Sequence, residues 1–79
     1  MYLAVKDVKP MDQHLLLLTF ENGQVRTFDM RPYLNIGIFK ELQDISMFNT
    51  VRISFDTIAW ANDADLDPEL LYKNSKLVE

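Results

Sequence analysis

The chain has no cysteine and only one histidine, which excludes several kinds of site at the outset. Without cysteine, neither a disulfide nor a cysteine-based metal site can stabilise the fold. A chain of 79 residues buries only a small core. We therefore expect either very efficient packing or an interface that completes the core, and we favour the interface. The lack of cysteine also fits a cytoplasmic protein.

Glycine and proline are scarce, with two and three residues, and both fall singly between patterned stretches. The chain therefore contains no linker or low-complexity segment, and we expect residues 1–79 to form a single domain. The apolar run Leu15–Leu18 is far shorter than the roughly 20 residues of a membrane span. The N-terminus has no charged region leading into an apolar one, so we expect a cytoplasmic protein without membrane contact.

Positive charge is also limited, since eight Lys and Arg stand against twelve Asp and Glu, for a net charge of −4. The basic residues are spread along the chain, whereas a phosphate-binding surface needs them clustered, so we expect no direct nucleic-acid binding. The acidic excess is concentrated at Asp63, Asp65, Asp67 and Glu69. This segment either keeps the protein soluble or attracts a basic partner.

A β-hairpin is the strongest structural signal. Strand-like runs over residues 15–21 and 24–29 flank Asn22-Gly23, a dipeptide suited to positive φ at both positions of a two-residue turn. Counting back from that turn gives the pairs Phe20 with Val25, Leu18 with Thr27, Leu16 with Asp29, Thr19 with Arg26, Leu17 with Phe28, and Leu15 with Met30. Apolar pairs then lie on both faces away from the turn, so we expect the sheet to be covered on both faces there.

Two further strand regions accompany this hairpin. Residues 2–9 alternate imperfectly, which suits an outer strand, and Pro10 closes it. Residues 51–55 and 58–60 alternate around a turn at Asp56, which predicts a second hairpin. We therefore expect a sheet of about five antiparallel strands.

Short helices are expected between and after the strands. Asp29 caps a helix over residues 30–34 with Pro32 in its first turn, and Gly37 ends it. A second helix over residues 38–42 places Ile38, Phe39 and Leu42 on one apolar face. Asp44 caps a further short helical turn that carries Ile45 and Phe48. Asp67-Pro68-Glu69 starts a terminal helix, from which Leu70, Leu71 and Leu77 pack. The fold class is therefore α+β, a small antiparallel sheet of about five strands with short covering helices and a C-terminal helix.

No pattern of catalytic or cofactor-binding residues is present. His14 is the only side chain that titrates near neutrality, and an exposed loop or strand-edge position explains it. The serines lack the Gly-x-Ser-x-Gly turn, and the two glycines lie too far apart for a phosphate cradle. We therefore expect no enzyme, no catalytic residue and no cofactor.

A calcium loop is the nearest metal motif. Asp63-x-Asp65-x-Asp67 has its opening spacing, but Pro68 occupies the glycine position and Asn74 the position of the bidentate glutamate. We therefore expect no metal.

Two aromatic residues flank the acidic segment. Trp60 and Tyr72, with polar neighbours, have the composition of a protein-binding hot spot. For Trp60, however, a core position is the favoured interpretation, and its indole N–H then needs Asn62 or a backbone carbonyl as acceptor. The candidate partner-binding residues are Trp60, Asn62, Asp63, Asp65, Asp67 and Tyr72.

A series of motifs resembles one family along nearly the whole chain. The motifs are Phe20-x-Asn22-Gly23 with Asp29, Gly37-x-Phe39-x-x-Leu42-x-Asp44, Phe48-x-x-Val51, Ile58-x-Trp60-x-Asn62, and Asp65-x-Asp67-Pro68-x-x-Leu71-Tyr72. Their order and spacing are similar to those of the bacterial domain of unknown function 2442. In that family glycine usually follows the asparagine after the tryptophan, where this chain has Asp63. The resemblance implies a compact α+β domain, in a family often encoded beside another small protein, as toxin and antitoxin pairs are.

These observations lead to two hypotheses. The first is a non-enzymatic interaction domain, either a homodimer or the acidic half of a two-protein module resembling toxin and antitoxin. The alternative is a small ligand- or metal-binding regulatory domain that uses the acidic loop, residues 63–69. A rise in melting temperature with calcium or a small molecule distinguishes the second from the first.

Overall fold

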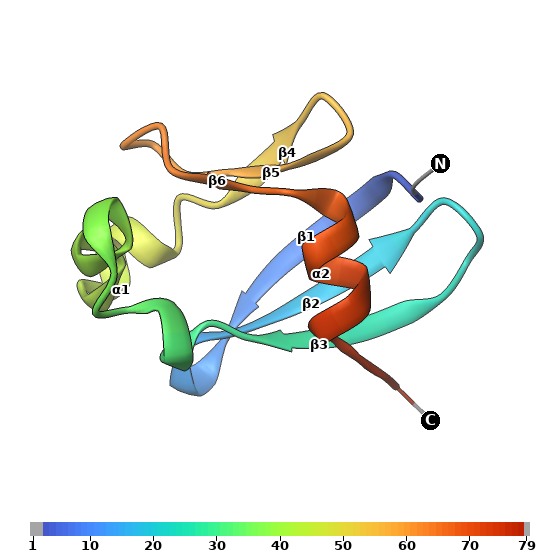
Figure 1. Ribbon diagram of the computed structural model, residues 1–79, viewed down its shortest axis with the longest axis horizontal. Helices are drawn as coiled ribbons and strands as arrows, with labels where there is room; N and C mark the ends of the chain where they lie inside the picture. The colour runs from blue at the N-terminus through green and yellow to red at the C-terminus, as the bar shows by residue number, and fades with distance from the viewer. Residues whose placement is uncertain (1–2, 79) are drawn as a thin grey trace.

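The computed structural model describes residues 3–78 and shows two antiparallel sheets joined by short helices (Figure 1). The first sheet has the strand order β1-β2-β3-β7, and the second has the order β4-β5-β6. The strands are β1 (Val5–Met11), β2 (Leu15–Phe20), β3 (Val25–Asp29), β4 (Arg52–Ser54), β5 (Thr57–Ala59), β6 (Asp65–Leu66) and β7 (Lys76–Leu77). The 3-10 helices are η1 (Asp12–His14), η2 (Arg31–Tyr33) and η3 (Gly37–Gln43), and the α-helices are α1 (Ile45–Phe48) and α2 (Pro68–Asn74). The predicted α+β class is confirmed, and the short strands β6 and β7 were not predicted.

The β2–β3 hairpin has the predicted strands but a different turn. Its loop is three residues long, residues 21–23. The N–H of Phe20 donates to the carbonyl of Gln24 (2.9 Å), and the N–H of Gly23 donates to the carbonyl of Phe20 (2.9 Å). Within this loop only Gly23 has a positive φ (+87°), and the Asn22 side chain accepts from the N–H of Gln24 (3.0 Å). The predicted two-residue turn is therefore wrong, since it requires positive φ at both Asn22 and Gly23.

The longer loop shifts the register by one residue. Leu17 faces Thr27 instead of Phe28, and Phe28 pairs with Leu16 on the buried face. Since side chains alternate between faces, this shift moves Phe28 to the face opposite Leu17. Phe28 and Met30 are therefore core residues. Leu17 lies on the opposite face from Phe28 and Met30, whereas the predicted register placed all three on one face.

The N-terminal strand lies at the edge of the first sheet, as predicted. It runs past Pro10, which pairs with Leu16, and ends at Met11. A proline is tolerated there because an edge strand has one side free of ladder hydrogen bonds. Tyr2, the predicted start of the strand, lies outside the described residues.

Asp44 caps α1 as predicted, because its carboxylate accepts the backbone N–H of Ser46. The predicted cap by Asp29 is wrong, because Met30 is the N-cap of η2; the carboxylate of Asp29 lies one residue before it and accepts the N–H of Arg31. The predicted packing of Ile38, however, is wrong, because that side chain is 44% exposed. A 3-10 helix aligns residues three apart, so Leu42 packs together with Phe39, and Ile38 points away from the core.

Ile45 and Leu77 are also exposed, at 52% each, although the sequence predicts that both pack. Ile45 lies in the first turn of α1, which buries Phe48. Leu77 does not extend the terminal helix but belongs to β7, which pairs with β3. The predicted start of that helix is correct, because the carboxylate of Asp67 accepts the N–H of Glu69 at 2.9 Å.

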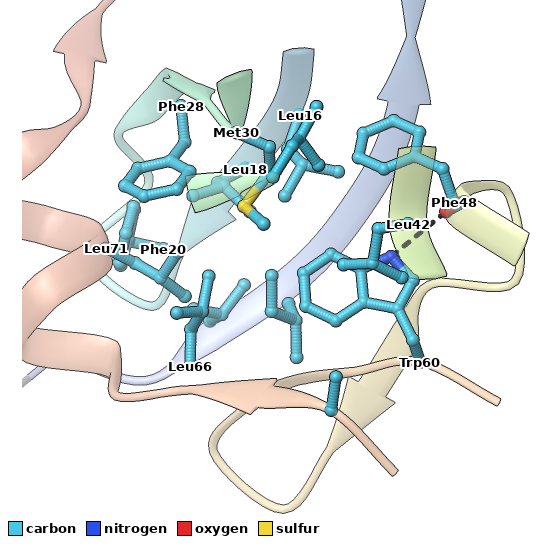
Figure 2. Close-up of a cluster of buried hydrophobic side chains, with 14 residues drawn as sticks. Leu16, Leu18, Phe20, Phe28, Met30, Leu42, Phe48, Trp60, Leu66 and Leu71 are labelled. Atoms are coloured by element: carbon cyan, nitrogen blue, oxygen red, sulfur yellow. Dashed lines mark hydrogen bonds between the residues drawn. The ribbon is translucent and has the colours of Figure 1, made fainter. Parts of the chain in front are cut away.

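One core lies between the first sheet, α2, the second sheet and the helical segment (Figure 2). Its buried members are Val5, Leu16, Leu18, Phe20, Phe28, Met30, Leu34, Leu42, Phe48, Ile58, Trp60, Ala64, Leu66 and Leu71. All the core residues from β2 are even-numbered, so a single face of the first sheet supplies the core.

Candidate functional site

Trp60 lies in the core and not on the surface. Its side chain is fully buried, and its indole N–H donates to the carbonyl of Phe48 at 3.0 Å (Figure 2). The favoured core interpretation of Trp60 is therefore confirmed, with a backbone carbonyl and not Asn62 as the acceptor, and its place among the partner-binding residues is wrong.

The turn that follows Trp60 repeats the geometry of the first hairpin loop. The backbone N–H of Trp60 donates to the carbonyl of Ala64 (2.9 Å), and the backbone N–H of Asp63 donates to the carbonyl of Trp60 (3.0 Å). The side-chain oxygen of Asn62 accepts from the backbone N–H of Ala64 (3.1 Å). Asp63 has a φ of +70° and so occupies the place that Gly23 holds in the first loop. An aspartate here takes a backbone conformation that favours glycine.

The polar side chains of the acidic segment are partly engaged within the fold. The amide of Asn62 donates to the carboxylate of Glu41 at 3.1 Å, which ties the turn to η3. Asp67 serves as the cap of α2. Asp63, Asp65 and Asp67 are all exposed, and Asp67 is the one of the three that caps a helix.

Tyr72 lies against the first hairpin, away from the turn that carries Asn62. Its hydroxyl donates to the Gln24 side chain at 2.9 Å, and its ring meets Phe20 edge-on at 5.1 Å. The guanidinium of Arg26 lies 4.4 Å from the ring centroid. The structure therefore does not bring the six predicted residues together: Trp60 is buried, and Tyr72 packs in a different region.

His14 has a structural position that the sequence did not indicate. It is half-buried rather than exposed; its Nε2–H donates to the carbonyl of Leu42 at 3.0 Å, and its ring contacts Phe48 edge-on at 4.8 Å. It connects the first sheet to the helical segment. Among residues 3–78, no group of three or more histidine, aspartate or glutamate side chains is placed to hold a metal ion.

The tip of the β4–β5 hairpin carries a residue that the sequence analysis missed. Phe55 and Asp56 form the two-residue loop, because Ser54 pairs with Thr57, and this loop projects from the molecule (Figure 1). Phe55 is 98% exposed and has a φ of +56°. Glycine is the usual residue at a positive φ in such a loop. The available signal was an aromatic residue between polar ones within a turn.

The first sheet has a second face that supplies no core residue, here called the outer face. It carries Asp7, Lys9, Met11, Leu15, Leu17, Thr19, Val25, Thr27, Asp29 and Lys76, as the strand register and alternation place them. None of these side chains is buried. The predicted cover over Leu15 and Leu17 is therefore not supplied by the part of the chain that the structure describes.

Comparison with known proteins gives one result. The family model described as "Protein of unknown function (DUF2442)" matches residues 5–76. Neither the curated proteins nor the solved structures include a match. Over residues 3–78, the structure has no helix that is both long and apolar enough to cross a membrane.

Proposed function

The chain belongs to the DUF2442 family of proteins of unknown function, and we propose that it is a non-enzymatic protein-interaction domain. Phe55 is the anchor that inserts into an apolar pocket of the partner. The observation that carries this proposal is the combination, in one residue, of a strained backbone and an aromatic ring in solvent.

Folding alone gives no reason for phenylalanine at this position. A left-handed conformation costs an L-residue about 1–2 kcal/mol, and a bulky residue in it is uncommon. A ring that is 98% exposed returns almost none of this cost through burial. Such outliers are concentrated at functional sites. Burying a phenylalanine ring in a partner contributes about 1.5–3 kcal/mol, as expected of an interface anchor.

The acidic charge of this chain indicates that the partner is basic. The chain carries a net charge of −4, and Asp63 and Asp65 are exposed on the second sheet and its turn. A basic partner is attracted to this charge, which speeds its encounter with the chain. We therefore expect a small basic protein, as in two-protein modules of the toxin and antitoxin type.

No contact among the described residues favours the alternative, a ligand or metal at residues 63–69. The carboxylate of Asp67 is bonded to the helix that it caps, and Asn62 is bonded to Glu41. Under our proposal, calcium and small molecules leave the melting temperature unchanged.

The test is affinity purification from the native host with three tagged forms: wild type, Phe55→Gly and Ile45→Ala. Ile45 is the matched control, since it is also an exposed hydrophobic residue, at 52%, but lies on a helix. We expect wild type and Ile45→Ala to retain one stoichiometric basic protein and Phe55→Gly to lose it.

Phe55→Gly should at the same time be more stable by about 1 kcal/mol, because glycine relieves the positive φ. This gain distinguishes lost binding from unfolding. Retention of the partner by Phe55→Gly, or no partner with any form, contradicts the proposal.

A further inference from the structure

The outer face of the first sheet has the residue pattern of a covered surface. Strand β2 carries Leu15 and Leu17 on the outer face and Leu16 and Leu18 in the core. A strand with one solvated face alternates apolar and polar residues, whereas one covered on both faces is apolar throughout. Met11 lies directly opposite Leu15 on β1 and extends the apolar area.

We propose that the outer face packs against the same face of a second copy of this chain, forming a two-fold symmetric dimer. The inference does not rest on Phe55, which lies in the loop that joins β4 and β5 of the second sheet. It adds a self-association surface to the partner-binding role proposed above.

The charge of the outer face indicates a second copy rather than the basic partner. Its two aspartates and two lysines cancel, whereas the whole chain has eight basic and twelve acidic residues. A face suited to a basic protein carries an acidic excess. An electrically balanced face on an acidic chain can instead meet its own copy without net repulsion.

The arrangement of these charges also suits two-fold symmetry. Asp7 and Lys9 lie two positions apart on β1, on the same face, and both are exposed. No ion pair joins either of them to another side chain within residues 3–78. In an isologous interface, a contact between residue i and residue j occurs twice. Asp7 of each copy can therefore pair with Lys9 of the other.

The small size of the face indicates a weak interface. Strands of this length and spacing form a face of roughly 17 by 19 Å. Packing two such faces buries on the order of 1,000 Å² in total, at the lower end of specific interfaces. We therefore expect a dissociation constant in the micromolar range, on the order of 10 μM.

The test is sedimentation equilibrium of the full chain over a concentration range that brackets this affinity. The forms are wild type, Asp7→Lys, Lys9→Glu and the double exchange of both. Each single change places like charges opposite each other, so we expect dimerisation to weaken about tenfold or more. The double exchange restores the opposite-charge pairs, and its dimerisation should return to near the wild-type level.

Two controls change the same charges elsewhere. Lys40→Glu on η3 and Asp65→Lys on β6 alter exposed residues away from the outer face. Both should leave dimerisation unchanged, as should Phe55→Gly. A second variant, Leu17→Thr, introduces a β-branched residue that suits a strand and removes apolar contact, so it should weaken the dimer without a change of charge. Circular dichroism establishes that every form is folded.

The inference is overturned by a monomer at every concentration, by a dimer that the outer-face changes do not weaken, or by a double exchange that stays as weak as the single ones. A dimer lost in Phe55→Gly or Asp65→Lys places self-association elsewhere and also overturns it. Loss of the purified partner in Phe55→Gly with an intact dimer supports both proposals, so the two can fail separately.

Discussion

Replacing Asp63 with glycine should stabilise the protein. Asp63 closes the β5–β6 turn at a φ of +70°, and its side chain is exposed. No ion pair of Asp63 is present among residues 3–78. The substitution therefore removes backbone strain without removing a contact of the side chain.

The magnitude follows from two opposing terms. An L-residue in the left-handed region costs about 1–2 kcal/mol, with aspartate at the lower end because its short polar side chain tolerates this region. Glycine avoids this cost but loses more conformational entropy on folding, about 0.5–1 kcal/mol. The net gain is therefore about 0.5 kcal/mol, which corresponds to a rise in melting temperature of about 2–4 °C for a domain of this size.

Thermal melting followed by circular dichroism measures the effect in three variants. Asp63→Asn removes the charge but keeps a side chain, and it should leave stability within a few tenths of a kcal/mol of wild type. Gly23→Asp makes the opposite change in the equivalent turn, where a Cβ atom would meet nothing within 4 Å. It should therefore destabilise the protein by a similar amount, through the backbone alone.

The reasoning is refuted if Asp63→Gly melts at or below the wild-type temperature. An equal rise in Asp63→Asn also refutes it, because the gain then comes from reduced repulsion with Asp65 and Asp67 and not from the backbone.

Three other predictions concern single contacts. Trp60→Phe removes the shorter of two hydrogen bonds to the carbonyl of Phe48, which keeps the bond from the N–H of Val51 (3.4 Å), and it also leaves a cavity in the core, so it should cost about 2–3 kcal/mol in urea unfolding. Asp67→Ala removes the cap of α2 and should cost about 1 kcal/mol, which thermal melting measures. The hydrogen bond from the Arg31 side chain lowers the pKa of Asp29 below its usual 3.8. The resulting stabilisation is small for a surface pair; it is fully present above pH 3.8 and is lost as the pH falls through the lowered pKa of Asp29. Urea midpoints should therefore differ between wild type and Asp29→Asn at neutral pH, and converge once the pH is below that lowered pKa.

The helix starts were predicted from the sequence more completely than the turns. Asp44 and Asp67 were correctly identified as caps, since a cap depends on a side chain and backbone N–H groups within two or three residues. The positions of both predicted hairpins were also correct. The register predicted for the first hairpin was not, because one loop residue more or fewer changes every pair in the ladder.

The candidate site was less predictable than the fold. Trp60 and Tyr72 lie twelve positions apart and flank the acidic segment, but one enters the core and the other packs against the first hairpin. Phenylalanine is usually a core residue. Phe55 is exposed to solvent because it lies in a strained turn. Exposure depends on contacts between distant segments, which neighbouring residues do not specify.

By itself, the sequence determined the α+β class, the positions of the two hairpins, and the caps of α1 and α2. These features depend on local hydrogen bonds and on residue periodicity, which are present in any short stretch of the chain. Only the tertiary structure decided that Leu17 lies on an uncovered face, that Trp60 is buried and that Phe55 is exposed. The physical reason is that burial is a property of the assembled layers: a one-residue shift of register, or a 3-10 helix in place of an α-helix, sends an apolar side chain to a different face.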